Sequence, residues 1–441
     1  MRQFRMAVAI DQQPHGFKPF SRSQRCKLQS YGHLDYNNFL DLNQTTFLAF
    51  QAENIHRSFS TPCLPVNGVE DLHPPHPRVE IVRGSGAPVH ALVVEVAVAM
   101  ASGIQPILLP SGLGGAYVFP NTNGNNIAVA KPVDEEPFAY NSPKEFKSNN
   151  HQMLVQPDLK RSIRIGETGI RELAAYLLDH GGFSGVPPTA LVKFCHATFS
   201  ESSSTVKLAS LQRFVGHSFD AGELGPSLFS VDSVHKIGIL DIRLMNLDRH
   251  AGNMLVMKQD NNSFVDSVAT TDLVPIDHGF CLPEWLEDPY FEWLHWPQAS
   301  VPFSESELDY ISKLDPSKDA DILRSEVPSL RESSIRVLIV CTVFLKQAAA
   351  AGLCLADIAQ MMTRKFCGGE ESQSELENIC LKVKAGINNE NVEDKDDGET
   401  KTNYGIGGIS FGDMNKGEWE LFVEIFDKFV IGVFEDKKCK N

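Results

Sequence analysis

Two carboxylates and one amide are spaced as metal-assisted phosphate chemistry would require. Asp248 and Asn253 are separated by four residues, and an apolar run, Met254–Met257, follows them. Asp277 follows a second short apolar run and precedes a glycine. The first carboxylate could orient an acceptor hydroxyl, while the amide oxygen and the second carboxylate could hold a metal ion on phosphate oxygens. A polar loop and a turn-forming aspartate are the competing interpretations.

A glycine turn and a strand lysine precede these groups. The turn at 111–115 (SGLGG) lies between an apolar run and a strand-like segment, and a loop without Cβ atoms lets backbone N–H groups approach phosphates. A simple tight turn would also explain it. Lys131 ends an apolar strand, and Glu172 on the next helix is its expected partner, with Glu167 as the alternative. Together, the order of the four elements favours kinase-type phosphoryl transfer.

The elements that must position these residues change in character along the chain. Glycine turns and strand-like segments, at 126–131, 190–196 and 207–215, dominate the part before residue 215. Apolar residues at helical spacing dominate the part after it. We therefore expect an α+β, two-lobed, protein-kinase-like fold, with a small β-rich N-lobe over a mainly helical C-lobe.

Composition changes divide the chain further. Residues 1–80 are rich in Ser, Pro, His, Asn and Gln and are predicted to be largely disordered. The N-lobe is predicted at 81–215 and the C-lobe at 216–384. An acidic, flexible linker is expected at 385–408, followed by a helical segment at 409–441 with an aromatic-rich pattern.

The overall charge and cysteine usage limit the partners and the compartment. A net charge of −16 disfavours general affinity for nucleic acid or for an anionic membrane surface, although a local basic patch could still exist. The nine cysteines form no CxxC pair and no secreted framework. Polar residues interrupt the apolar stretches 91–109 and 335–351, so we expect buried helices and no transmembrane segment. We expect a cytoplasmic protein, with peripheral membrane contact and the nucleus both left open.

Several stretches of the chain resemble a known family. The stretches that carry the resemblance are SGLGGAYVF, VAKPVDEEPFA, GETGIRELAAYLLD, SLQRFVGHSFDAGELGP, ILDIRLMNLDRHAGNML, PIDHGFCLPE and WPQASVPFSESE, within about residues 79–367. They resemble the phosphatidylinositol 3/4-kinase superfamily, most closely the type II phosphatidylinositol 4-kinases and, within them, the plant gamma group.

The resemblance implies a role for each matching residue, with ATP and Mg²⁺ (or Mn²⁺) bound. Asp248 would be the catalytic base, with His250 as a second candidate. Asn253 and Asp277 would hold the metal, and Lys131, with Glu172, would contact the ATP phosphates. The phosphate loop and the hinge that holds adenine would be formed by Ser111, Gly112, Leu113, Gly114, Gly115, Ala116, Tyr117 and by Gln212, Arg213, Phe214, Val215.

Three departures from the wider family are visible. The animal type II enzymes carry a palmitoylated cysteine run after the lysine, whereas residues 147–164 contain no cysteine. Residues 1–80 do not suit the ubiquitin-like repeats of some plant relatives. His250 stands where the animal enzymes have glycine, which leaves Asp248 and His250 both open as proton acceptors.

Three functions are consistent with these residues. The first is a lipid kinase that phosphorylates the 4-hydroxyl of phosphatidylinositol in a membrane surface. The second is a protein Ser/Thr kinase that uses the same ATP site. The third is a pseudokinase scaffold that binds partners through the linker and the terminal helix. The aromatic stretch 285–296 suits either a membrane interface or the core of the helical lobe.

Overall fold

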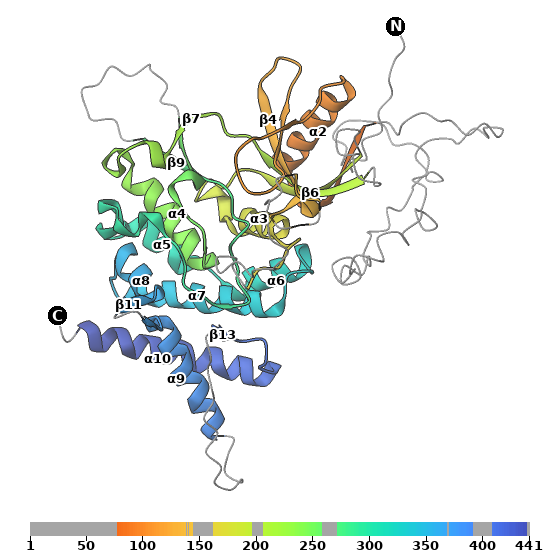
Figure 1. The fold of residues 1–441 in the computed structure, drawn as a ribbon. Coiled ribbons are helices and arrows are strands. Elements are labelled where there is room, and N and C mark those ends of the chain that lie inside the picture. The colour runs from red at the N-terminus through yellow and green to blue at the C-terminus, as the bar shows by residue number, and fades with distance from the viewer. Residues whose placement is uncertain are drawn as a thin grey trace, which may run out of the picture.

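The structure is a computed structural model that describes residues 77–137, 139, 141–143, 162–195, 206–257, 271–367, 370–390 and 408–438. Nearly all of the predicted N-terminal region 1–80, and residues 391–407 of the predicted linker, lie outside the described residues. The described chain forms a strand-rich lobe stacked on a helical lobe (Figure 1). The two-lobed α+β fold predicted from the sequence is confirmed.

One antiparallel six-stranded sheet forms the N-lobe, in the order β1-β5-β6-β4-β3-β2. Helix α2 (Ala87–Ala101) covers one face, where Val89, Leu92 and Val96 pack with Phe119 and Phe194 of the strands. Lys131 lies near the end of β4, in the middle of the sheet. The strands are β1 (Arg78–Arg83), β2 (Ile107–Leu108), β3 (Tyr117–Pro120), β4 (Asn126–Pro132), β5 (Thr189–Cys195) and β6 (Val206–Arg213).

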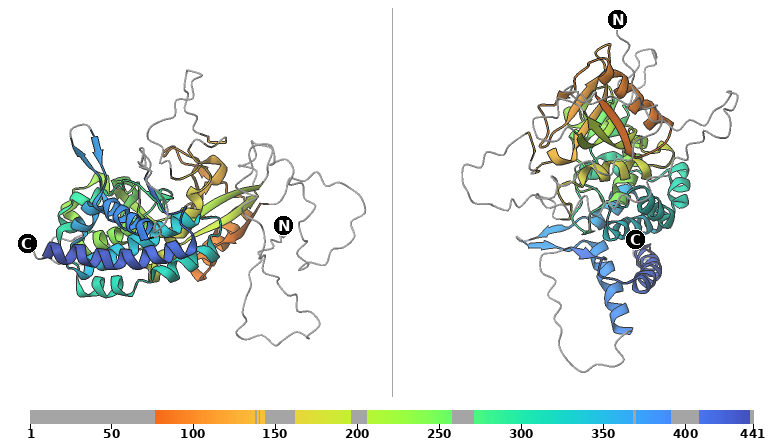
Figure 2. Two further views of the ribbon diagram at one scale, coloured as in Figure 1. Left: turned by 90° about the horizontal axis from the view of Figure 1, so that it is seen from below. Right: turned by 90° about the vertical axis from the view of Figure 1, so that its right-hand side faces the viewer.

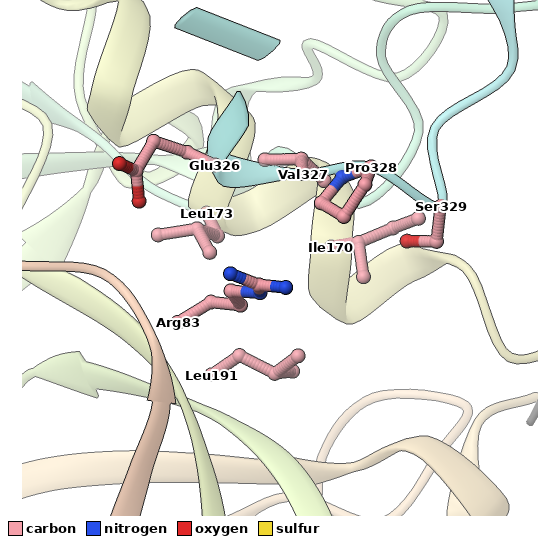
Figure 3. A pocket seen from close by; sticks show the side chains of 8 residues that line it. All are labelled: Arg83, Ile170, Leu173, Leu191, Glu326, Val327, Pro328 and Ser329. Atoms are coloured by element: carbon pink, nitrogen blue, oxygen red, sulfur yellow. The ribbon is translucent and has the colours of Figure 1, made fainter. Parts of the chain in front are cut away.

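Helix α3 (Thr168–Leu178) lies between the sheet and the helical lobe (Figures 1 and 2). Behind it, Ile170 and Leu173 face Leu191 of β5 and the turn 326–329 of the C-lobe across a cavity of about 10 Å³ (Figure 3). A cavity of that size holds at most one water molecule. None of the predicted site residues lines this cavity. Its small size means that α3 is closely packed against β5 and the C-lobe on this side.

Buried helices and a three-stranded sheet, β7-β8-β9, build the C-lobe. Helix α4 leads into residues 248–253, called the catalytic-loop segment from here on, and α7 runs through the core. The terminal helices α9 and α10 pack against each other and lie below the lobe in Figure 1. The helices are α4 (Val231–Leu244), α5 (Glu305–Lys313), α6 (Pro316–Glu326), α7 (Glu332–Ala350), α8 (Leu355–Met362), α9 (Glu375–Glu390) and α10 (Lys416–Lys438).

Short elements complete the described chain. The three-stranded sheet consists of β7 (His217–Asp220), β8 (Met254–Met257) and β9 (Leu273–Pro275), and the remaining strands pair as β10 (Trp285–Leu286) with β13 (Ile409–Ser410) and β11 (Lys365–Cys367) with β12 (Glu370–Ser372). The 3₁₀ turns are η2 (Val133–Glu135), η3 (His180–Gly182), η5 (Ala221–Glu223), η6 (Pro226–Leu228), η7 (Ala251–Asn253), η8 (Glu292–His295) and η9 (Pro297–Ser300).

Helix α7 alone among the described helices is long and apolar enough to cross a membrane. Yet 83% of its apolar stretch is buried inside the protein. Burial of that extent is typical of a core helix, as the sequence predicts for this stretch.

The predicted start of the linker at residue 385 is wrong. Residues 385–390 belong to α9 and are helical. The apolar face of that helix, formed by Leu376, Ile379, Val383 and Ile387, stays buried as far as Ile387. Spacing of three and four residues continues past residue 385, so the helix continues there too.

Candidate active site

Lys131 is the meeting point of three elements. Its Nζ lies 2.7 Å from Glu172 Oε1 on α3 and 3.0 Å from Asp277 Oδ1 after β9. Glu172 is therefore the partner that the sequence predicts. The alternative, Glu167, instead pairs with Arg171 and Arg331. Residues that are 41 and 146 positions from Lys131 thus meet at one ammonium group.

Burial and charge act in opposite directions on this trio. Burial would lower the pKa of the Lys131 ammonium, but the carboxylates of Asp277 and Glu172 raise it above its usual value. Burial would raise the pKa of Asp277, yet Lys131 holds it below its usual range. Burial raises the pKa of Glu172, against the effect of Lys131. Lys131 is therefore a permanent cation beside the anion Asp277, as phosphate binding requires.

The glycine turn folds back onto the residues that follow β4. Gly115 N–H donates to the carbonyl oxygen of Glu135 at 2.7 Å, and Tyr117 OH donates to the Glu135 carboxylate at 2.7 Å. A Cβ on Gly115 would lie 2.3 Å from that carboxylate. Gly112 is needed for another reason, because its φ of +83° is unfavourable for other residues. The turn is therefore a docked loop.

The predicted hinge is the end of β6 and the segment after it. Gln212 donates to Thr189 Oγ1 at 2.9 Å, and Arg213 forms an ion pair with Glu95 on α2. Phe214 N–H donates to the carbonyl of Ile127 on β4 at 3.0 Å. These contacts occupy the side chains of Gln212 and Arg213, and the Val215 carbonyl oxygen lies 2.9 Å from His217 Nδ1.

The catalytic-loop segment is tied to its own start. Asn253 Nδ2 donates to the carbonyl of Asp248 at 2.9 Å, which leaves the Asn253 side-chain oxygen turned away as an acceptor. His250 N–H also donates to that carbonyl, at 2.9 Å. The Asp248 side chain is half-buried, and His250 is exposed. Both proton acceptors that the sequence leaves open are therefore still open.

A buried ion pair beneath the loop was not recognised in the sequence. Arg249 Nε lies 3.0 Å from both carboxylate oxygens of Asp241 on α4. Arg249 Nη1 donates to the carbonyls of Asn253 and Ile276, which joins the loop to the residue before Asp277. Asp241 also accepts from Asn246 and Trp293. The only signal in the sequence is an aspartate on an otherwise apolar helix face, ILDIRL.

The backbone at Asp277 is unusual. Its φ is +54°, in the left-handed region that non-glycine residues seldom occupy. The next residue, His278, is fully buried, and its backbone N–H donates to Glu172 Oε2 at 3.1 Å. Burial, then Arg249 and Lys131, holds the pKa of His278 well below its usual value, so its ring is neutral. Glu172 thus bridges Lys131 and the segment of Asp277.

The aromatic stretch 285–296 belongs mainly to the core. Phe291, Trp293 and Trp296 are buried, and the Trp293 ring stacks on Phe291 and donates to Asp241. Tyr290 remains 48% exposed. Of the two interpretations of this stretch, the core is therefore the better one.

No group of three or more His, Cys, Asp or Glu that could hold a metal by itself occurs among the described residues. The oxygens of Asn253 and Asp277 do fit a metal that is shared with phosphates. Mg²⁺ commonly takes one or two protein oxygens and completes its shell with substrate and water.

Comparison with known proteins places this site in a family. The family model "Phosphatidylinositol 3- and 4-kinase" matches residues 112–358, from the glycine turn to α8. This chain belongs to the phosphatidylinositol 3- and 4-kinase family. The matched range contains Lys131, Glu172, Asp248, Asn253 and Asp277.

Individual relatives of this kinase extend the likeness beyond the matched domain. It is 61% identical over 404 residues to phosphatidylinositol 4-kinase gamma 1 of Arabidopsis thaliana, which covers 89% of this chain and 71% of the relative. It is 59% identical to phosphatidylinositol 4-kinase gamma 8 of the same plant, over 89% and 74% of the two chains. Phosphatidylinositol 4-kinase gamma 4 of Oryza sativa is 40% identical, over 71% and 55%. The predicted resemblance to the plant gamma group is confirmed.

Proposed function

We propose that this kinase transfers the γ-phosphate of ATP to the 4-hydroxyl of phosphatidylinositol, giving phosphatidylinositol 4-phosphate. The observation that carries the proposal is the junction of Lys131 with Glu172 and Asp277, at 2.7 and 3.0 Å. The acceptor comes from relatives up to 61% identical, which are named phosphatidylinositol 4-kinases.

Each residue has a distinct part in the proposed reaction. The Lys131 ammonium would hold the α- and β-phosphates, and Glu172 would keep it in place. The glycine turn before Gly115, whose own N–H is bonded to Glu135, would bring its backbone close to the phosphates, and the backbone near Val215 would accept adenine. Asn253 and Asp277 would hold Mg²⁺ or Mn²⁺, which neutralises phosphate charge when it is bound.

Asp248 would orient the inositol hydroxyl and accept its proton. It lies on the same short loop as the metal-binding Asn253, and the two are joined through the Asp248 carbonyl. This link keeps the acceptor and the phosphate in a fixed relation, which is the main source of catalysis in phosphoryl transfer. The exposed imidazole of His250 is the second candidate for the base.

A membrane-bound acceptor fits the surface beside the phosphate loop. Ile107 and Leu108 on the edge strand β2 are 57% and 42% exposed, and Leu113 in the loop is 57% exposed. Residues 96–130 contain no charged side chain, although the whole chain carries −16. An uncharged apolar edge suits a lipid surface, where a negatively charged one would be repelled. We propose a cytoplasmic enzyme that contacts membranes peripherally.

The deciding experiment offers both acceptor classes to one preparation. Purified kinase with Mg²⁺ and labelled ATP is mixed with phosphatidylinositol vesicles and, separately, with protein substrates. We expect labelled phosphatidylinositol 4-phosphate. Labelled protein without labelled lipid would favour the protein kinase. If neither the wild type nor Asp277→Ala consumes ATP in the presence of Mg²⁺, the chain would be a pseudokinase scaffold.

A further inference from the structure

Two adjacent glutamates after β4 tie the phosphate loop and helix α3 to the lysine strand. Glu135 accepts Gly115 N–H and Tyr117 OH, as described above, and also lies 3.2 Å from Lys207 Nζ. Glu136 faces the other way, toward the start of α3. One short backbone segment therefore contacts both the phosphate loop, through Glu135, and the start of α3, through Glu136.

Glu136 satisfies three backbone donors at the start of α3. Its carboxylate accepts from Gly166 N–H at 2.6 Å, Thr168 N–H at 3.0 Å and Gly169 N–H at 3.4 Å. The first N–H groups of a helix have no partner within the helix. The residue at the N-cap position, Glu167, makes no side-chain cap. The cap comes instead from a residue about 30 positions earlier in the chain, and only 5% of that residue is exposed.

The cap links the segment that contains Lys131 to the helix that contains Glu172. Lys131 lies five residues before Glu136 on one side, and Glu172 lies one helical turn beyond the capped amides on the other. The 2.7 Å contact between Lys131 and Glu172 joins the two sides. A shift of the start of α3 would therefore move Glu172 relative to both Lys131 and the backbone of His278.

We propose that Glu136 is a positioning residue for phosphoryl transfer, which caps α3 from the segment after β4 and thereby holds Glu172 against Lys131. This inference rests on the proposed kinase activity. It assigns to a residue outside the nucleotide contacts the task of keeping α3 in its active position.

The chain contains a matched control at the other end of the same helix. Asp179 is also a buried carboxylate that accepts backbone N–H groups, from Ser184 at 2.7 Å and Val186 at 2.9 Å. Burial raises the pKa of Asp179, as it raises that of Glu136. Asp179 follows the last turn of α3, away from Lys131. Asp179→Asn therefore tests the loss of a buried carboxylate that accepts backbone N–H groups of a loop, without changing the start of the helix.

The experiment is a double-mutant cycle between Glu136→Gln and Glu172→Gln, with Glu136→Ala and Asp179→Asn as single variants. We expect Glu136→Ala to lower kcat about 10–100-fold, with the Gln variant in between because it keeps one acceptor oxygen. Asp179→Asn should change kcat less than about twofold, whatever it does to the Tm. If Glu136 acts through Glu172, the double variant should be no slower than Glu172→Gln alone.

Two outcomes would overturn the inference: independent, multiplying losses in the double variant, or a loss of kcat in Asp179→Asn equal to that in the matched amide variant Glu136→Gln. If turnover of Glu172→Gln is too slow to measure, the Kd for ATP of the wild type, the two single Gln variants and the double variant provides the same cycle. Variants that fold poorly are recognised by their Tm, and the Gln pair then carries the test. A wild type that transfers no phosphate to either acceptor class would instead refute the proposed function.

Discussion

Two cation–carboxylate centres flank the catalytic loop, and they are built differently. The Lys131 ammonium meets Glu172 and Asp277. The side chains of Lys131 and Asp277 are 29% and 44% exposed, whereas that of Glu172 is 3% exposed. The Arg249 guanidinium meets Asp241 where neither side chain is exposed. The Lys131 centre keeps charge accessible to a ligand. The Arg249 centre uses its charge internally, on a carboxylate and two backbone carbonyls, and so fixes the loop.

This difference shows that the same pair of charges serves either binding or architecture, according to burial. A buried ion pair with satisfied hydrogen bonds is costly to break from one side. A partly exposed pair is screened by water and contributes little to stability. Mutations at the two centres should therefore separate turnover from folding.

The largest expected effect is on turnover, at the loop that the Arg249 centre holds. Asp248→Asn is nearly isosteric and removes the proton-accepting carboxylate. We expect kcat to fall by about 10²–10⁴-fold, with the Kd for MgATP unchanged. Steady-state kinetics and nucleotide titration on the same preparation measure both. His250→Ala should cost much less, and the opposite ranking would assign the base to the imidazole.

The next effect compares the stability of the two centres. Asp241→Ala leaves the Arg249 charge buried and deprives Asn246 and Trp293 of their acceptor, so the free energy of unfolding should fall by about 3–5 kcal/mol. Lys131→Ala should lower it less than Asp241→Ala does, because Asp277 stays in contact with water and the buried Glu172 keeps the hydrogen bond from His278 N–H. Turnover and ATP affinity should still fall. Denaturant unfolding of both variants makes the comparison. Equal losses of stability would show that the Lys131 centre is also architectural.

A smaller effect depends on pH. Burial raises the pKa of Glu136 to about 7 from 4.5, since its backbone donors only partly offset the loss of water. Because the folded-state pKa lies above the unfolded one, the contribution of this group to stability is full below about pH 4.5 and is lost as the pH rises through 7. The loss is roughly 3 kcal/mol. Urea unfolding at pH 5 and pH 8 should show this extra fall in wild type but not in Glu136→Gln.

The smallest effect concerns the phosphate loop. At Gly112 no atom lies within 4 Å of an added Cβ, and only the φ of +83° opposes a side chain. Gly112→Ala should therefore cost about 1 kcal/mol of stability, as measured by thermal unfolding. Gly115→Ala should lower ATP affinity more strongly, because its Cβ would displace the Glu135 carboxylate. If both variants bind ATP like wild type, the docked loop does not shape the site.

The sequence predicted the parts of the site that local patterns encode. The pairing of Lys131 with Glu172 followed from a strand lysine and the next amphipathic helix. The role of Asp241 was missed because one aspartate on an apolar helix face does not reveal its partner. Glu136 was missed because no local pattern marks a glutamate after a strand as the acceptor for the amides of a later helix. The stretch 285–296 was ambiguous because aromatic composition suits a core and a membrane equally, and only tertiary packing separates the two.

The backbone at Asp277 has a consequence for how this fold tolerates change. Glycine adopts a left-handed φ of +54° more readily than aspartate does, although aspartate tolerates it better than most residues. A screen for thermostable variants should therefore recover glycine at position 277, and those survivors should be the ones without the metal-binding carboxylate. Stability therefore favours glycine at position 277, whereas turnover requires the aspartate.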